Sequence, residues 1–295
     1  MTERSPLRLN VGPGLVFEIE SPSLGLRRAI EEQLAFFVER RTSTCGRPLA
    51  IRASRPPRSR PEGAPAVSEG SLEVYRDEHA VFLEAPGILS WYDLDSGDAG
   101  IWVTTENEPS LAAFASLALV SLLIELAAPR GWLALHAAAV ASADHGILLP
   151  GESGVGKSTL FESCRQSGFG VLSDDLVWLH LTQGAPRLHP FPRGDGHSVI
   201  SPTCDQVPLR SIVCPSIVPG SASTIARARP SQVAQVLLAQ SSFLTSGQAK
   251  ARRFKELARI AAITPGFALQ AGTDPESPPK LLRELALESF GSRPC

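Results

Sequence analysis

The chain has 295 residues, enough for one large domain or two modest ones, and 43% of them are hydrophobic. This content supports a sizeable core and excludes a chain that is disordered throughout. The 28 Lys and Arg nearly balance the 30 Asp and Glu, for a formal net charge of -2. The balance argues against a nucleic-acid partner, because proteins that bind nucleic acid over a broad surface are normally basic.

Residues 1–128 are predicted to form a smaller β-rich region with one helix. The segment Leu7–Ser21 has a Gly-Pro-Gly turn between two apolar runs, which is typical of a hairpin. Apolar residues at helical spacing follow over Leu24–Arg40, and Leu72–Thr105 is predicted to contain several strands joined by tight turns. This region is a candidate for substrate recognition.

Two segments of the same region have distinctive compositions. Ser54–Gly70 is rich in proline, glycine and arginine and is predicted to be an exposed, mobile loop, with arginines that are solvated or contact an acidic partner. Ser110–Ala128 is almost long enough to cross a bilayer, but it contains Glu125 and three serines, and prolines flank it. We therefore expect a buried helix there and no membrane partner.

From Gly131 onward, strands are predicted to alternate with helices. Trp132–Ser142 and residues 146–150 are expected strands joined by a turn, and a glycine-rich loop and a helix follow. The helix is expected to end near residues 167–170, where glycine suits the C-terminal cap. Past Pro190 the chain is predicted to be rich in loops. Helices are expected again at about residues 230–242, 247–262 and 279–290.

The segment Gly151–Ser158 matches the phosphate-binding pattern G-x-x-x-x-G-K-[ST] between a predicted strand and a predicted helix. Its glycines allow backbone N–H groups to face phosphate oxygens, and the helix dipole favours the same anion. Lys157 is expected to bind the β- and γ-phosphates of ATP, and Ser158 to bind Mg²⁺. The predicted nucleotide-binding residues of this α/β domain, residues 129–295, are Gly151, Ser153, Gly154, Val155, Gly156, Lys157, Ser158 and Thr159.

This loop serves several classes of protein, so other motifs must decide among them. A GTPase would need a base-reading Asn-Lys-x-Asp motif, and the chain has none. Leu244–Arg252, with the sequence LTSGQAKAR, is close to the signature of ABC-type ATPases, but no apolar strand ending in Asp-Glu follows it. We interpret this segment as a turn at the start of a helix.

Asp174 and Asp175 are adjacent at the end of a short predicted strand, and Asp174 is the sixteenth residue after Ser158. In most P-loop proteins the acid associated with Mg²⁺ comes much later in the chain. Two carboxylates beside a phosphate loop can divide two tasks: one binds the metal, and the other accepts a proton from the attacking hydroxyl. The alternative is a polar turn between two strands.

Three parts of the chain, in order, are similar to the HPr serine kinase/phosphorylase family: a strand with His136, the loop Gly151–Ser158, and a strand that ends in Asp174-Asp175. The match is dense over residues 133–180 and looser to about residue 290. The resemblance implies a P-loop fold like that of phosphoenolpyruvate carboxykinase and ATP-dependent phosphorylation of a protein serine. The family's Glu-x-Arg-Gly segment is absent, which indicates a divergent member with an acceptor other than HPr.

Carried over residue by residue, the resemblance implies that Lys157 and Ser158 bind phosphate and metal. Asp174 would then lie at the metal, Asp175 would be the catalytic base, and His136 would lie near the transferred phosphate. The resemblance also implies a homo-oligomer, because HPr kinases are hexamers.

Arg193, in the segment Phe191–His197, is a further candidate for binding a phosphate, the alternative being a glycine-rich surface turn. We therefore expect an α/β, HPr kinase-like P-loop domain that uses ATP and Mg²⁺ to phosphorylate a serine of a protein or peptide, such as the precursor of a peptide natural product. A nucleotide-sensing regulator without transferase activity and a small-molecule kinase are the alternatives.

The cysteines indicate the compartment. Their number is odd, and none is part of a Cys-x-x-Cys motif, so neither a disulfide framework nor a zinc site is expected. The first ten residues lack the apolar run of a signal peptide. We expect a cytoplasmic protein with reduced thiols at Cys45, Cys164, Cys204, Cys214 and Cys295.

Overall fold

The computed structural model divides the chain into two compact units, each with its own β-sheet, in a mixed α/β architecture. The first unit comprises Met1–Gly131, Arg193–Val199 and Phe243–Ser246, and the second comprises Trp132–Pro192, Ile200–Ser242 and Gly247–Cys295. The structure describes residues 5–291 except 14, 22, 40–47, 70–71, 106–110, 112–114, 116–117, 192–202 and 242–246.

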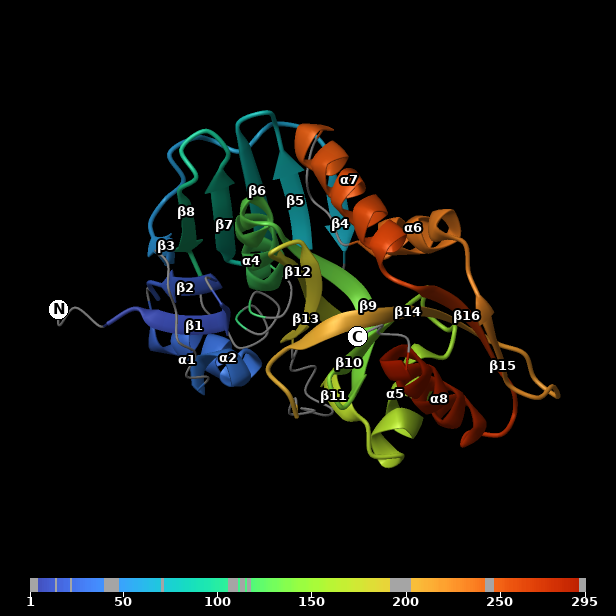
Figure 1. Ribbon diagram of the computed structural model, residues 1–295. Helices are drawn as coiled ribbons and strands as arrows, with labels where there is room; N and C mark the ends of the chain where they lie inside the picture. The colour runs from blue at the N-terminus through green and yellow to red at the C-terminus, as the bar shows by residue number, and fades with distance from the viewer. Residues whose placement is uncertain are drawn as a thin grey trace. The chain divides into compact units, whose positions relative to one another are not determined.

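The first unit contains an eight-stranded sheet in the order β1-β2-β3-β8-β7-β6-β5-β4 (Figure 1). Its neighbours are antiparallel except that β3 runs parallel to both β2 and β8. The predicted hairpin is confirmed, because β1 and β2 pair antiparallel. The strands are β1 (Leu7–Gly12), β2 (Leu15–Ile19), β3 (Leu49–Ala53), β4 (Val67–Glu69), β5 (Leu72–Arg76), β6 (Ala80–Ala85), β7 (Ile88–Asp93) and β8 (Ala99–Val103).

The helix predicted over Leu24–Arg40 is two helices, α1 (Leu24–Gln33) and α2 (Ala35–Glu39). Ser23 caps α1, since its side chain accepts a hydrogen bond from the N–H of Leu26 at 3.0 Å. Within the apolar run before residue 128, α4 (Leu119–Ala127) is almost entirely buried, and the 3-10 helix η2 (Ala128–Arg130) follows it. No helix in the described part of the chain has the length and apolar character that a membrane crossing requires.

The loop between β3 and β4 makes several contacts within its own unit. Arg58 forms ion pairs with Asp93 at 3.1 Å and Asp95 at 2.8 Å. Arg60 lies over the ring of Tyr75, with its guanidinium carbon 4.1 Å from the ring centroid. The described part of this loop is largely exposed, as predicted, and the side chains of Arg58 and Arg60 are 42% exposed. They also contact acidic and aromatic side chains of the same sheet, which the sequence did not predict.

The second unit contains another eight-stranded sheet, β10-β9-β12-β13-β14-β16-β15, in which β11 also pairs with β9. Because β10 pairs in parallel with β14 as well, the strands β10, β9, β12, β13 and β14 close into a ring of backbone pairings. The strands are β9 (Trp132–Ser142), β10 (His145–Pro150), β11 (Gly170–Ser173), β12 (Leu176–Thr182), β13 (Ala185–Phe191), β14 (Val207–Ile217), β15 (Thr224–Arg227) and β16 (Gly266–Ala271).

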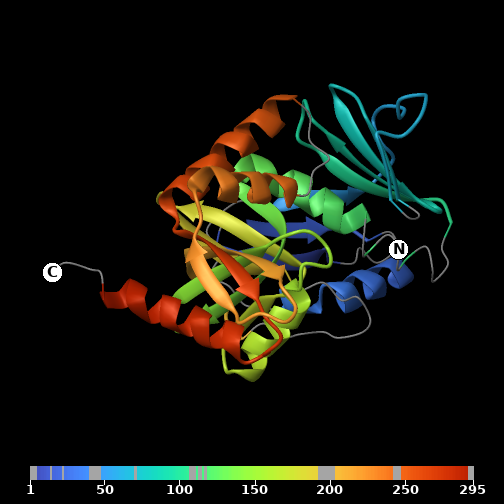
Figure 2. The same ribbon diagram turned by 90° about the vertical axis from the view of Figure 1, so that its right-hand side faces the viewer.

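The helices of this unit agree closely with the predicted ones. Figures 1 and 2 show α6 and α7 side by side in orange, and α8 in red contacts α5. The prediction of a loop-rich stretch past Pro190 is wrong, because β14 covers eleven residues of it. The sequence did not predict this strand because it contains Pro208 and Pro215, and proline is disfavoured in the interior of a sheet. The helices are α5 (Lys157–Gln166), α6 (Pro230–Ala239), α7 (Gly247–Ile263) and α8 (Ser277–Gly291).

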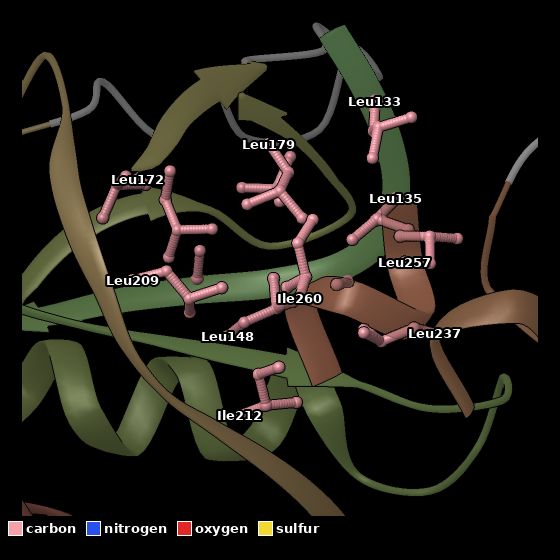
Figure 3. Packing of buried hydrophobic residues seen from close by; sticks show 14 of the residues in the cluster. Leu133, Leu135, Leu148, Leu172, Leu179, Leu209, Ile212, Leu237, Leu257 and Ile260 are labelled. Atoms are coloured by element: carbon pink, nitrogen blue, oxygen red, sulfur yellow. The ribbon is translucent and has the colours of Figure 1, made fainter. Parts of the chain in front are cut away.

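The sequence of β9 is apolar at nearly every position because both of its faces are buried. Odd-numbered residues such as Leu135 and Ala139 belong to a cluster completed by α6 and α7, part of which Figure 3 shows. Even-numbered residues such as Ala138 and Val140 belong to a second cluster, completed by α5 and α8. His136 interrupts the even-numbered series, so a polar side chain lies where the strand would otherwise continue an apolar face.

Replacing Leu135 by Ala should destabilise the protein by about 2–5 kcal/mol, because the side chain is fully buried between two packed layers. The matched control is Leu287→Ala, at a leucine of α8 that is 64% exposed, with an expected change below about 0.5 kcal/mol. Urea unfolding of both variants measures the difference. Equal effects would contradict the assignment of Leu135 to the core.

Candidate active site

The pairing of β9 brings the predicted motifs together within the second unit. On one edge of β9, Pro150 at the end of β10 pairs with Ala137. On the other edge, Leu176 at the start of β12 pairs with His136, and the N–H of Ala137 donates to the carbonyl oxygen of Asp175 at 2.9 Å. The loop after β10 and the acids before β12 therefore lie on either side of the same two residues of β9.

The predicted phosphate loop, residues 151–158, lies between β10 and the first turn of α5. Gly154 and Gly156 have φ angles of +87° and +91°, in the left-handed region that L side chains rarely adopt. A Cβ atom at Gly156 would also lie 2.8 Å from Cδ1 of Ile217, so a side chain there would require the end of the Ile217 side chain to shift. α5 begins directly after Gly156, which has no capping side chain, and this leaves the N–H groups of the first turn for another acceptor.

Lys157 folds back over this loop. Its ammonium is buried and donates to the carbonyl oxygens of Gly151 at 2.7 Å and Glu152 at 2.8 Å. Burial lowers the pKa of Lys157, and the negative charge of Asp175 acts in the opposite direction. The cation is thus held at the loop by neutral carbonyl groups, which an anion can replace as the stronger acceptor.

His136 lies between two acceptor oxygens. Its Nε2 is 2.8 Å from Oδ1 of Asp175, and its Nδ1 is 3.2 Å from Oε1 of Gln240. A carboxylate and an amide oxygen both accept hydrogen bonds, so the imidazolium form of His136 satisfies the two contacts. The hydrogen bond to Asp175 raises the pKa of His136 and that to Gln240 assists, while burial and the charge of Lys157 oppose them.

Gln240 is a site residue that sequence reasoning missed. It follows α6 directly, is almost fully buried, and its carbonyl oxygen accepts a hydrogen bond from the backbone N–H of His136 at 2.8 Å. A glutamine at the end of a helix gives no sequence signal for this contact. The next residue, Ser241, bridges to Leu135, so this segment follows β10 along the same edge of β9.

The other predicted site residues vary in exposure. Asp174 and Asp175 are both partly buried in the bend between β11 and β12, and Ser158 and Thr159 are exposed in the first turn of α5. The prediction for Arg193 concerns a residue outside the described part of the chain. The phosphate-loop residues Ser153 and Gly154 are exposed, Gly151 is buried, and Val155 is partly buried.

Within the described residues, no group of three or more His, Cys, Asp and Glu is arranged to hold a metal ion. Ser158 and Asp174 nevertheless offer the oxygen atoms that Mg²⁺ prefers, and Mg²⁺ commonly takes its remaining ligands from water and substrate phosphates. Three of the cysteines are free thiols, Cys164, Cys204 and Cys214. Burial raises the pKa of Cys164 to about 12 and that of Cys214 to about 11, so neither is a thiolate near neutral pH.

Comparisons with known proteins add little to this geometry. No protein-family model and no curated protein matches the chain. Among solved structures, the chain is similar to the Hpr(Ser) kinase/phosphatase from Coxiella burnetii, with 12% identity over 54% of this chain and 93% of that one, at a TM-score of 0.32. A likeness this distant carries no argument for the activity, and the expected relation to HPr kinases stays a prediction.

The raised pKa of His136 predicts a pH-dependent contribution to stability. A pKa above the unfolded value of 6.5 stabilises the folded protein below about pH 6.5, and this contribution is lost as the pH rises through the folded pKa. His136→Gln should therefore be more destabilising at about pH 6 than at about pH 9, as measured by urea unfolding at both values. In NMR titrations, Asp175→Asn should lower the pKa of His136. A destabilisation that is equal at both pH values would contradict the protonated pair.

Proposed function

We propose that this chain is an ATP- and Mg²⁺-dependent kinase that transfers the γ-phosphate to a serine hydroxyl of a protein or peptide other than HPr. The observation that carries the proposal is the convergence on β9 of a phosphate loop with its buried lysine and a histidine–aspartate pair. The order of these motifs along the chain, which resembles that of HPr kinases, supports the same assignment.

The phosphate loop explains how the nucleotide binds. Left-handed glycines and the uncapped first turn of α5 present N–H groups, and the ammonium of Lys157 replaces its two carbonyl contacts by phosphate oxygens. Ser158 and Asp174 would hold Mg²⁺ together with the phosphates, and the metal would supply positive charge to the transferred group. The burial of Lys157 and its two carbonyl contacts keep its charge close to the loop.

In this proposal His136 and Asp175 assist the transfer of the γ-phosphate. The serine oxygen forms a bond to the γ-phosphorus, the bond from that phosphorus to the bridging oxygen of ADP breaks, and Asp175 accepts the serine proton. Protonated His136 places a second positive charge beside the transferred group, at the contact of 2.8 Å with Asp175. A carboxylate has two oxygens, so Asp175 can hold the imidazolium and also approach the serine.

The acceptor and its recognition complete the proposal. The balanced charge argues against broad nucleic-acid binding, and the resemblance favours a protein or peptide as the acceptor, with residues 1–128 assigned to its recognition. We also propose that the chain acts in the cytoplasm and assembles as a homo-oligomer, as the resemblance implies.

Lys157→Ala should reduce ATP affinity or turnover by about two orders of magnitude or more, because a buried cation that binds the phosphates is lost. Lys255→Ala is the matched control, since Lys255 is exposed on α7, and it should leave both quantities unchanged. Calorimetry with ATP and Mg²⁺, together with an ATP turnover assay, measures them. If Lys157→Ala leaves affinity and turnover intact, the phosphate loop is wrongly assigned.

Asp175→Asn should keep ATP bound and abolish phosphorylation of serine, because the amide has a similar shape but does not accept the proton. Asp174→Asn should instead raise the Mg²⁺ concentration that activity requires. Asp144→Asn, in the turn at the far end of β10, is the control and should change neither property. The readout is mass spectrometry of candidate peptides, proteins and small alcohols incubated with ATP and Mg²⁺, with HPr included.

Phosphoserine on a peptide or protein other than HPr supports the proposal. A phosphorylated metabolite indicates a small-molecule kinase instead. If ATP binds tightly but no acceptor is modified, while the affinity for a partner changes with nucleotide, the chain is a nucleotide sensor. Exchanged effects of Asp174→Asn and Asp175→Asn would reverse the roles of the two acids.

A further inference from the structure

The two neighbours of β10 give the phosphate loop two chemically different sides. On the β9 side lie His136, Asp175 and Gln240, which are polar and linked by hydrogen bonds. On the other side, β14 runs parallel to β10, so its C-terminal end lies beside the start of the loop. That end carries Ile217, whose Cδ1 and Cγ1 lie 2.8 and 2.9 Å from the ideal Cβ position of Gly156.

Ile217 is an unusual residue because a large apolar side chain next to the phosphate loop is 52% exposed. Its backbone is nevertheless well fixed: Ile217 pairs with Ala271 of β16, and the N–H of Val218 donates to the carbonyl oxygen of Ala271 at 2.9 Å. The described residues include other large apolar side chains of similar exposure, and they are Leu24, Phe254, Ile263 and Leu287. Ile217 differs in its contact with Gly156 of the loop.

A nucleotide has the same division into charged and apolar parts. Its phosphates are anionic, and the base joined to them through ribose has two broad faces of low polarity. With the phosphates in the loop, the γ-phosphate belongs beside the polar side, where the transfer takes place. The base then belongs on the β14 side, where covering Ile217 removes apolar surface from water.

Resting on the proposed function, we infer that Ile217 is a binding residue for the nucleobase, whose face packs on its exposed side chain. The fixed end of β14 makes this a preformed surface, and the bare backbone at Gly156 lets the base and the phosphates follow one continuous surface. An aliphatic side chain has no hydrogen-bonding groups, so it packs against the face of a purine and does not distinguish the polar groups on the edge of the base. Ile217 therefore contributes equally to the binding of ATP and GTP.

The test compares ligands that share the phosphates and differ in the base. Calorimetry with ATP, GTP and inorganic tripolyphosphate, each with Mg²⁺, is performed on the wild type, Ile217→Ser and Ile217→Val. Ile263→Ser is the matched control, because Ile263 is also half exposed, at 50%. Ile263 precedes the first residue of β16, whereas Ile217 pairs with the last residue of that strand, so the two isoleucines lie near opposite ends of it. Roughly 16 Å of strand separates the two positions along β16.

We expect Ile217→Ser to weaken ATP and GTP binding by about five- to tenfold, since one apolar contact is lost, and to leave tripolyphosphate binding within about twofold of wild type. Ile217→Val should retain most of the affinity, and Ile263→Ser should retain all of it. An equal loss for tripolyphosphate would show that Ile217 only shapes the loop, and unchanged ATP affinity would show that the base lies elsewhere. Either result overturns the inference and leaves the proposed function standing. If the wild type binds neither nucleotide nor tripolyphosphate, the proposed function fails as well.

Discussion

The backbone pairing of β9 at His136 and Ala137 is the constraint on which the candidate site depends. The N–H of His136 donates to the carbonyl oxygen of Gln240, and the N–H of Ala137 donates to that of Asp175. These two adjacent groups thereby fix segments from different parts of the chain, including one that lies 104 residues from His136. A shift of one residue in this pairing would turn His136 to the opposite face of β9 and separate it from Asp175.

The charges of the site stabilise one another through that geometry. Asp175 raises the pKa of His136 and opposes the fall that burial causes in the pKa of Lys157, so one carboxylate favours the charged form of both side chains. Gln240 contributes an acceptor without a charge and thereby fixes the ring of His136 from its other side. The carbonyl oxygens of Gly151 and Glu152 accept hydrogen bonds from the ammonium of Lys157 and hold it at the loop.

The strand order of the sheet places polar side chains on one side of the loop of residues 151–158 and an apolar side chain on the other. Because β10 pairs with β9 on one edge and with β14 on the other, the loop that follows it has polar groups on one side and Ile217 on the other. The buried clusters on the two faces of β9 hold these strands in place, with α6 and α7 on one face and α5 and α8 on the other. The site is therefore a product of strand order as much as of any single motif.

Local patterns in the sequence determined the glycine-rich loop of residues 151–158, the helix after it and the three C-terminal helices, since each depends on residues close together in the chain. The sequence did not reveal β14, because its prolines disguise a strand whose pairing with β10 and β16 comes from distant segments. It also did not reveal the positions of Gln240 and Ile217, a glutamine after a helix and an isoleucine at a strand end, which have no local signature. Their positions beside His136 and Gly156 follow from the register and order of the strands, which only the tertiary structure decides.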